Sequence, residues 1–450
     1  MSYLVSQNSV ITTLNVGGKP EFLSCGGTNI APKGGITWSN FSVSTSNFKY
    51  IFNSNNYIGC IKDPKVRGYP ASNSTAPATI KQFLYDNGNI QYVCGQFVLS
   101  NPLTATNIMY FNPNLNNSTT GDATFNNLST ISFSSNSTVN CMAFLNNTDG
   151  SVDTTKLVIA GTFSNATIGG TSSFANIALL NFATPSTWTI NTSIVQNGTT
   201  DGQVNASTTT INSIILIGDI IYVAGVGGAG SNNCLFYSYN TTTSTWTNLL
   251  SSSNAGTINV IKKTTDNIIA IGGGFITLEG ITCNNIALYT IGVGFSALGD
   301  GVQEVPASSP IYASPCVFAL DFLKSTATTS GDLWIGGYFI KAGGLTANSI
   351  ALYKINTNTW EVIDRTGDNA SPTTKGLLSD TADSTNPGVV YTMSISALDT
   401  SVITVGGSFR TLLSKSNIPA TIYNLVKIIT SAPSNTAPKR SFTKFNSTST

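Results

Sequence analysis

Histidine is absent from this chain of 450 residues. Its absence excludes Ser-His-Asp and Cys-His catalysis, a histidine general base and imidazole metal ligands. Charge is also scarce, because Asp, Glu, Lys and Arg make up only 9% of the chain, against roughly 25% in ordinary soluble domains. The 21 basic and 20 acidic residues leave a net charge of +1. We therefore expect no nucleic-acid partner, since no positive field is available to neutralise phosphates.

Long apolar runs are missing too. No window approaches the roughly 18 apolar residues of a membrane span, so the sequence predicts none. Residues 1–9 lack the charged start, apolar stretch and cleavage pattern of a secretory signal, and we expect synthesis in the cytoplasm. The 7 cysteines are an odd number without a Cys-x-x-Cys pair. This favours reduced thiols in a reducing compartment over a disulfide framework.

The polar residues that do occur are mainly Asn, Ser and Thr, together with 41 Gly. These residues favour turns and sheet surfaces over helix interiors. Long amphipathic helical patterns are absent, so the sequence predicts an all-β protein. A module also recurs in a fixed order, which indicates a repeat architecture. Its clearest copy runs Gly337-Tyr338-Phe339, Gly343-Gly344, Ser349-Ile350-Ala351-Leu352-Tyr353 and Thr359-Trp360.

Each copy contains a glycine that ends an apolar strand, usually two residues before a Phe. These anchor glycines are Gly26, Gly95, Gly161, Gly225, Gly273, Gly337 and Gly407. Successive anchors are 48 to 70 residues apart, so seven copies fill nearly the whole chain. The spacing predicts one domain over residues 1–430, followed by a C-terminal tail rich in Ser, Thr, Asn and Pro at 431–450.

Four short strands can be assigned within a copy, for example 316–322, 333–339, 349–353 and 359–363 in the sixth. Four antiparallel strands joined by tight turns form one blade, and a ring of blades leaves few open edges. The sequence therefore predicts a single β-propeller with seven four-stranded blades, with six or eight as alternatives. Either 3–5 or 442–445 completes the last blade, and we favour 3–5.

Recurring bulky residues are predicted to fill the seams between blades. Phe97, Phe163, Phe275, Phe339 and Phe409 follow the anchor glycines, and Trp188, Trp246 and Trp360 lie on outer strands. The glycines themselves give room where strands converge, or allow positive φ in a tight turn.

These residues resemble the kelch-type β-propeller repeat. The best agreement is Ile221-Tyr222-Val223-Ala224-Gly225-Val226-Gly227-Gly228, then Tyr237-Ser238-Tyr239-Asn240 and Thr243-Ser244-Thr245-Trp246. The commoner local form, Gly-Gly-x-Phe with Asn-x-Ile-Ala-Leu-Tyr, is similar to a variant found in fungal cortical polarity proteins and in uncharacterised repeat proteins of bacteria and large DNA viruses. The resemblance covers residues 90–430. Kelch motifs specify a fold and not a chemistry, so it implies no catalytic residue and no cofactor.

Other candidate sites are weak. The acids that a two-carboxylate hydrolase would need are scattered and mostly lie beside glycines, at Glu279, Asp300, Glu304, Asp321 and Asp332. The glycine patterns at 225–230 and 292–297 precede strands or turns, whereas a dinucleotide site needs a following helix. Residues 149–153 are a partial calcium motif that we interpret as a loop. The sequence thus predicts no catalytic, cofactor-binding or metal-binding residue.

Three functions remain open. The first is a non-enzymatic structural or surface protein, an assembly or attachment element with protein partners or self-association, such as a virion component of a large DNA virus. The second is a glycan-binding or host-attachment module that uses Asn, Asp and Tyr in clefts or long loops such as 64–77, 112–127, 146–155 and 364–387. The third is a hydrolase with acidic residues in the propeller channel.

Overall fold

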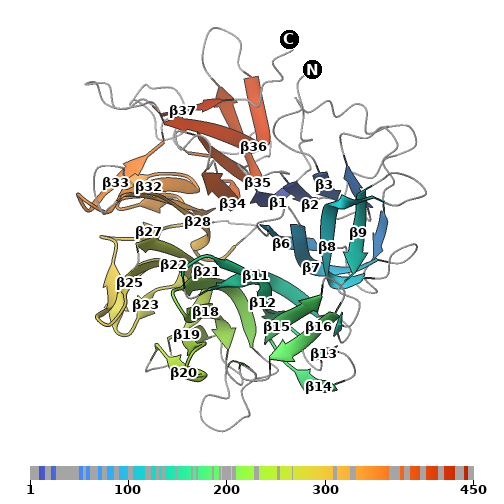
Figure 1. Ribbon diagram of the computed structural model, residues 1–450. Coiled ribbons are helices and arrows are strands. Elements are labelled where there is room, and N and C mark those ends of the chain that lie inside the picture. Colours follow the sequence, from blue (N-terminus) through green and yellow to red (C-terminus); the bar gives the residue numbers. More distant parts are fainter. Residues whose placement is uncertain are drawn as a thin grey trace. The chain divides into compact units, whose positions relative to one another are not determined.

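The computed structural model contains β-strands and no α-helix among the residues it describes, and its strands are labelled in Figure 1. Those residues are 10–15, 22–26, 50–53, 57–60, 69–72, 79–85, 91–99, 105–116, 123–127, 131–133, 137–147, 149–163, 166–168, 171–184, 187–191, 194, 204, 209–227, 233–250, 254–265, 267–307, 312–324, 331–363, 376–379, 386–395, 402–413, 420–430 and 440–443. None of them belongs to a helix long and apolar enough to cross a membrane.

The chain forms two compact units. Unit 1 comprises Met1–Ile51, Cys60–Val66 and Asn259–Thr450, and unit 2 comprises Phe52–Gly59 and Arg67–Ile258. In unit 1 the first hairpin pairs β1 (Val10–Asn15) with β2 (Phe22–Gly26). Strands β3 (Tyr50–Asn53) and β4 (Tyr57–Cys60) cross the boundary, and β5 (Tyr69–Ser72) lies in unit 2.

Unit 2 contains three sheets that each run as an antiparallel meander. The first contains β6 (Thr79–Tyr85), β7 (Gln91–Leu99), β8 (Ala105–Asn116) and β9 (Ala123–Asn127), and β5 also pairs with β7. The second consists of β11 (Thr138–Asn146), β12 (Val152–Thr162), β15 (Ile177–Thr184) and β16 (Thr187–Asn191). The third consists of β17 (Thr210–Ile217), β18 (Ile220–Gly227), β19 (Asn233–Asn240) and β20 (Thr245–Asn248).

Unit 1 repeats the same meander. One sheet is formed by β21 (Gly256–Thr265), which begins in unit 2, with β22 (Ile268–Phe275), β25 (Ile286–Thr290) and β26 (Gly294–Ala297). The next is formed by β28 (Cys316–Lys324), β29 (Gly331–Tyr338), β32 (Ile350–Lys354) and β33 (Thr359–Val362). The last is formed by β34 (Val389–Ile395), β35 (Val402–Leu413), β36 (Ala420–Thr430) and β37 (Arg440–Thr443).

The predicted fold class is confirmed: the protein is all-β and built from four-stranded antiparallel blades of the β-propeller type. The number of blades stays a prediction. The last sheet differs from the arrangement we favoured, because β37 pairs with β36 and takes the fourth position. Part of the segment predicted as a tail thus belongs to the sheet, while residues 3–5 lie outside the described chain.

Neighbouring sheets bury their facing side chains in shared cores. Within unit 2, one core lies between the sheets of β6 and β11 and another between those of β11 and β17. Within unit 1, one core lies between the sheets of β21 and β28 and another between those of β28 and β34. The recurring phenylalanines are at most 3% exposed, which confirms their predicted burial: Phe97, Phe163, Phe275, Phe339 and Phe409.

The outer tryptophans also behave as predicted where their side chains are described. Trp246 packs on Tyr239 and Trp360 on Tyr353, with ring centroids 5.0 Å and 5.1 Å apart. The indole Nε1 of Trp360 donates to the carbonyl of Leu298, in the neighbouring repeat, at 2.9 Å. The Trp188 side chain lies outside the described residues.

The anchor glycines are required by a bulge in the first strand of each sheet. At Gly337, an added Cβ would lie 2.0 Å from the Cys316 carbonyl oxygen, which is far inside van der Waals contact. The same clash, at 2.0 to 2.1 Å, would occur at Gly161, Gly225 and Gly407. None of these four glycines has positive φ. Close approach of two strands, and not a turn conformation, is therefore the reason for the recurring glycine.

A second glycine pair in the repeat marks small hairpins that we did not predict. These are β13 (Ala166–Ile168) with β14 (Thr171–Phe174), β23 (Thr277–Leu278) with β24 (Ile281–Thr282), and β30 (Lys341–Ala342) with β31 (Leu345–Thr346). Short strands from the preceding repeat extend two of them: β10 (Ile131–Ser132) pairs with β13, and β27 (Val302–Gln303) pairs with β30.

The residue before the third strand ties the second strand to the connection that leads to the next repeat. Asn285 accepts a hydrogen bond from the Phe275 N–H at Oδ1 (3.1 Å) and donates from Nδ2 to the Val302 carbonyl (2.9 Å). Asn176 repeats this arrangement with Phe163 and Val204. Asn107, Asn176, Asn285 and Ser349 all have positive φ, between 61° and 72°, a conformation that Asn tolerates better than most residues.

After the fourth strand, two repeats show the same backbone hydrogen bond across the connection that follows. The Gly301 N–H donates to the Leu298 carbonyl at 3.1 Å, and the Gly376 N–H donates to the Ile363 carbonyl at 2.9 Å. Both glycines have positive φ (69° and 67°), and a Cβ on either would collide with backbone oxygens. The two closures are therefore equivalent, although very different lengths of chain separate their ends.

Candidate functional site

The first strands of the sheets place one side chain of each repeat at an equivalent bulge. In unit 1 the bulge residues are Phe318 on β28 and Tyr391 on β34, and Asn259 on β21 is the corresponding residue of the neighbouring strand. We refer to Asn259, Phe318 and Tyr391 as the unit 1 row. A bulged residue leaves the regular alternation of the strand, and bulges often redirect side chains at binding sites.

Aromatic rings gather on this row. The Phe318 ring lies 5.5 Å from that of Tyr391 and 5.1 Å from that of Tyr312, which precedes β28. Tyr312 also packs on Tyr338, with ring centroids 5.5 Å apart. Tyr338 is fully buried, whereas Tyr312, Phe318 and Tyr391 are each partly exposed. The buried Tyr338 ring thus packs on Tyr312, which in turn packs on Phe318.

The two outer tyrosines share a hydrogen bond between their hydroxyls. The Tyr312 and Tyr391 oxygens are 3.2 Å apart, and either hydroxyl can donate. This is long for an O–H···O bond, whose usual length is about 2.7–2.8 Å. Burial, followed by the bond from Tyr312, raises the pKa of Tyr391 well above its ordinary value. Tyr391 is therefore an uncharged phenol at neutral pH.

Asn259 borders the row with an amide. Its Nδ2 donates to the Val317 carbonyl at 3.0 Å and lies 3.0 Å from the Cys316 sulfur. Burial raises the pKa of the Cys316 thiol to about 11, although the bond from Asn259 opposes the rise. The thiol is consequently neutral and a poor nucleophile. Five described cysteines are free, which agrees with the predicted absence of a disulfide framework among them: Cys94, Cys141, Cys234, Cys283 and Cys316.

One ion pair lies on the same strands. Lys262 on β21 contacts Asp321 on β28 at 2.6 Å, and Asp321 also accepts the Ile395 N–H of β34 at 2.7 Å. Asp321 is only 8% exposed. It therefore links the first strands of three successive sheets, and its charge is balanced by Lys262.

In unit 2 the equivalent bulge positions hold Lys81, Asn140 and Asn212. Each asparagine donates from Nδ2 to a backbone carbonyl on the next first strand, Asn140 to Ile211 and Asn212 to Ile258, both at 2.9 Å. These amides act as bridges between repeats. Burial lowers the pKa of Lys81, partly opposed by Cys94, because the surrounding protein penalises its charged form.

The acids singled out from the sequence do not assemble into a catalytic pair. Asp321 is bound to Lys262, and Glu304 pairs with Lys341 at 2.5 Å. Glu279 has positive φ in a hairpin turn, and Asp300 is exposed beside Gly301. Asp332 lies on β29 opposite Leu323 and Lys354. Among the described residues, no group of three or more Cys, Asp or Glu side chains is placed to hold a metal ion.

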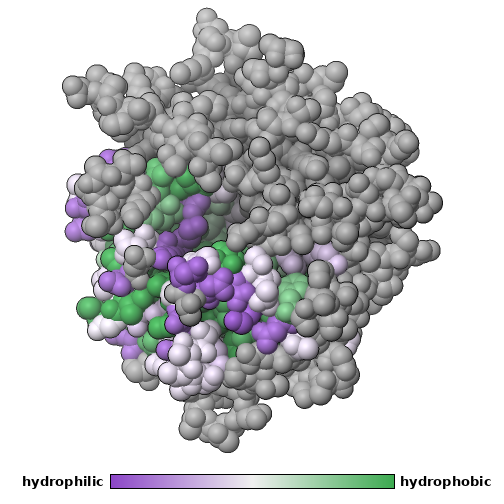
Figure 2. All heavy atoms as spheres, viewed as in Figure 1, coloured by the Kyte–Doolittle hydropathy of each residue, from purple (hydrophilic) through white to green (hydrophobic). Residues whose placement is uncertain are grey.

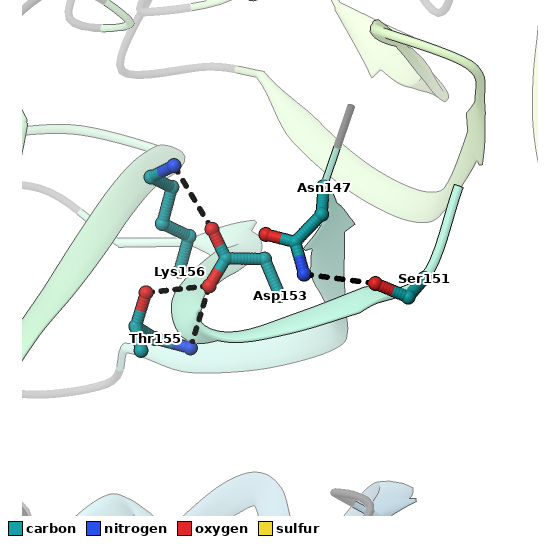
Figure 3. Close-up of polar contacts among 5 residues, drawn as sticks. All are labelled: Asn147, Ser151, Asp153, Thr155 and Lys156. Carbon is teal, nitrogen blue, oxygen red and sulfur yellow. Dashed lines mark hydrogen bonds and ion pairs between the residues drawn. The ribbon is translucent and has the colours of Figure 1, made fainter. Parts of the chain in front are cut away.

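The partial calcium motif at 149–153, which we interpreted as a loop, is a turn that runs into β12, where Asp153 lies. Asp153 accepts hydrogen bonds from the backbone N–H (3.0 Å) and hydroxyl of Thr155, and pairs with Lys156 at 2.9 Å (Figure 3). Burial raises the pKa of Asp153, but these hydrogen bonds outweigh it and hold that pKa below its ordinary value. Ser151 similarly donates to Asp149. Both carboxylates are thus satisfied within the loop.

The glycine pattern at 292–297 contains the turn into β26, which confirms that it does not precede a helix. The pattern at 225–230 begins in β18 and its last residues lie outside the described chain. The long loops 64–77 and 364–387 lie largely outside it as well. The predicted loop 112–127 is mostly strand, because residues 112–116 end β8 and residues 123–127 form β9. The unit 1 row was not singled out from the sequence, because its members differ from repeat to repeat.

No protein-family model and no curated protein matches the sequence. Among solved structures, one described as the structure of Dos1 propeller is similar. It is 12% identical, with a TM-score of 0.41, and the similarity covers 81% of this chain and 78% of that chain. A similarity at this level gives no information about function, which must be argued from the residues.

Proposed function

We propose that this protein is a non-enzymatic structural or surface element that acts by assembly or attachment. The observation that supports the proposal is the repeated bridging of neighbouring sheets through buried amides. Asn176 and Asn285 each bind two segments of backbone, one of them on the connection that leads to the following repeat. Because buried, fully satisfied polar groups fix a unique arrangement, consecutive blades present their turns in fixed positions.

The surface suits contacts between protein copies. Charged residues are only 9% of the chain, so little like-charge repulsion opposes close packing. On the face drawn in Figure 2, hydrophilic and hydrophobic residues are interspersed over the described part of the chain. The exposed large apolar side chains include Ile276 and Val293, which are 68% and 84% exposed.

The finer proposal is incorporation into the particle of a large DNA virus. Its support is the kelch-variant resemblance of the Gly-Gly-x-Phe and Asn-x-Ile-Ala-Leu-Tyr repeats, together with the low charge. We add that the exposed turns carry threonine and asparagine, as in Thr242 and Thr243, whose N–H groups both bind Asn240. In this turn the Thr242 hydroxyl also donates to the Asp219 carboxylate at 3.2 Å.

Two measurements test the proposal. Light scattering of the purified protein should show concentration-dependent self-association, and mass spectrometry of purified particles from the source should detect the chain at structural abundance. A protein that stays monomeric at all concentrations and is absent from particles would overturn the assembly role. Particle-bound protein that also turned over a substrate would contradict the non-enzymatic part.

A further inference from the structure

We propose that the outer edge of strand β23 binds an extended, uncharged segment of a partner protein as an added strand. This deepens the assembly role proposed above, on which it rests, because it names the kind of contact that a partner makes. The equivalent hairpin of the next repeat, β30 with β31, already carries an added strand, which is β27. We call the outer side of residues 276–278 the β23 edge.

Strand β27 shows what such a hairpin accepts. It pairs with β30 in antiparallel register. On one side of this pairing the Ile340 N–H donates to the Glu304 carbonyl at 2.9 Å, and on the other the Gly343 N–H donates to the Gly301 carbonyl at 2.8 Å. The short segment 301–304 thus completes the hairpin into a three-stranded sheet.

The β23 edge has the same local backbone without the added strand. Ile276 corresponds to Ile340, because the carbonyl of each accepts two N–H groups from the segment that follows the second strand of its hairpin. Strands β23 and β24, however, form a sheet of two strands. The described residues supply an acceptor for the Ile340 N–H but none for the Ile276 N–H. Such an edge is a template for strand addition by another chain.

Exposure differs between the two hairpins in the same sense. Ile276 is 68% exposed and Thr277 is also exposed, whereas Ile340 and Lys341 are each partly buried. Leu278 is fully buried, so the hairpin is anchored to its blade. Hydrophobic residues reach the surface in Figure 2 on the side where Figure 1 labels β23 and β25. The edge is therefore held in place and open to solvent.

The side chains of the edge define the chemistry of the occupant. In the β27 segment Glu304 pairs with Lys341 at 2.5 Å, but Thr277 takes the position of that lysine on β23. Lysine commonly protects edge strands from further pairing, and the sequence Ile-Thr-Leu at 276–278 contains no charge. Ile and Thr also favour strands. The occupant therefore needs an apolar side chain beside Ile276 and no acid opposite Thr277.

The test uses the intact protein and a blocked peptide with the sequence of residues 301–305, in which Glu304 is replaced by Gln. We expect the peptide to shift the amide resonances of Ile276 and Thr277 in NMR spectra. Hydrogen exchange of the Ile276 amide should slow, because its N–H gains an acceptor. The Ile340 amide should not respond, since β27 already occupies that edge.

Two variants alter the edge itself. Thr277→Pro removes an N–H of the edge strand, and Ile276→Ser removes the exposed apolar side chain without changing the backbone. Each should weaken peptide binding by about three- to tenfold, the usual effect of one hydrogen bond or of one partly buried apolar side chain. The matched control is Leu345→Ser, an exposed apolar residue on the hairpin that already carries β27, and it should leave the affinity unchanged.

A charge added at the edge should change the preference between peptides. Thr277→Lys gives β23 the residue that β30 has, so this variant should bind the peptide that keeps Glu304 about two- to fivefold better than the Gln peptide, the effect of an exposed ion pair. Thr247→Lys makes the same change at an exposed position on β20 and should show no such preference.

Circular dichroism establishes that each variant is folded. Light scattering without peptide measures self-association separately, so failure of this inference is distinguishable from failure of the assembly role. The inference is overturned if the peptide causes no shift at millimolar concentration, if Thr277→Pro and Ile276→Ser bind as the native protein does, or if the shifts appear at Ile340. It is equally overturned if Thr277→Pro abolishes self-association, because a second copy would then occupy the edge.

Discussion

Replacing Asn285 by alanine tests the link between repeats most directly. The substitution removes the acceptor of the Phe275 N–H and the donor to the Val302 carbonyl, which lie at 3.1 Å and 2.9 Å from the amide. It also places an alanine at a φ of 72°. The side chain is 7% exposed, so water cannot readily take over either bond.

The expected loss follows from these contacts. Each buried backbone group left unpaired costs about 1–3 kcal/mol, and a left-handed alanine costs about 1–2 kcal/mol relative to the relaxed backbone. Because the terms are not strictly additive, we expect Asn285→Ala to destabilise the surrounding repeat by about 3–6 kcal/mol. Asn285→Gly loses the same bonds without the backbone strain, so it should be less damaging by about 1 kcal/mol.

Hydrogen exchange is the appropriate measurement, because a chain of this length need not unfold in one step. Exchange of the Phe275 amide should accelerate strongly in Asn285→Ala and less in Asn285→Gly. Amides of the β17–β20 sheet, in unit 2, serve as an internal reference. If alanine left the Phe275 amide as protected as in the native chain, or if glycine were the more damaging change, the explanation of the recurring Asn would be wrong.

Three further predictions follow from the glycines, the thiols and the Asp153 loop. Gly337→Ala should lower the free energy of unfolding, measured with denaturant, by at least about 3 kcal/mol, because its Cβ would lie 2.0 Å from a carbonyl oxygen. Gly274→Ala should be mild, because its Cβ would meet only a sulfur at 3.3 Å. Equal losses of stability in the two variants would refute the clash. Burial raises the thiol pKa of Cys234 to about 12 and of Cys316 to about 11 from 9.0, so both should resist a thiol reagent at pH 8 until the protein unfolds. The contribution of the two thiols to stability should be complete below pH 9 and fall as the pH rises toward 11 or 12, because a thiol ionises at lower pH in the unfolded chain than in the folded protein. Rapid labelling of either thiol in the folded protein at pH 8 would contradict this. The depressed pKa of Asp153 means that its contribution is present above about pH 4 and lost on acidification; Asp153→Asn should abolish that local pH dependence, measured by hydrogen exchange of Thr155.

The strands and the blade packing could be predicted because they depend on residues that recur. Gly337 and Phe339 have counterparts in nearly every repeat, and a recurring glycine or large ring has few physical explanations. Even there the sequence left open why glycine recurs, either for room or for positive φ. The structure shows that Gly161, Gly225, Gly337 and Gly407 avoid a clash with a bulged strand and do not adopt positive φ.

The amide bridges could not be found in the same way. Asn is so common in this chain that Asn140 and Asn212 do not stand out, and only the register of the first strands shows that they face carbonyls of the next repeat. The aromatic row was hidden for the opposite reason. Phe318 and Tyr391 occupy a position where the repeats differ, and sequence periodicity gives no weight to residues that do not recur.

The hydrogen bond from the Gly376 N–H to the Ile363 carbonyl holds the two ends of residues 364–375 together, so this segment is a suitable insertion point. Twelve residues separate these two positions, whereas the equivalent closure from Leu298 to Gly301 needs only Gly299 and Asp300. Since the ends meet across one hydrogen bond in both cases, we expect that an epitope or reporter peptide of different length can replace residues 364–375 without altering the strands on either side.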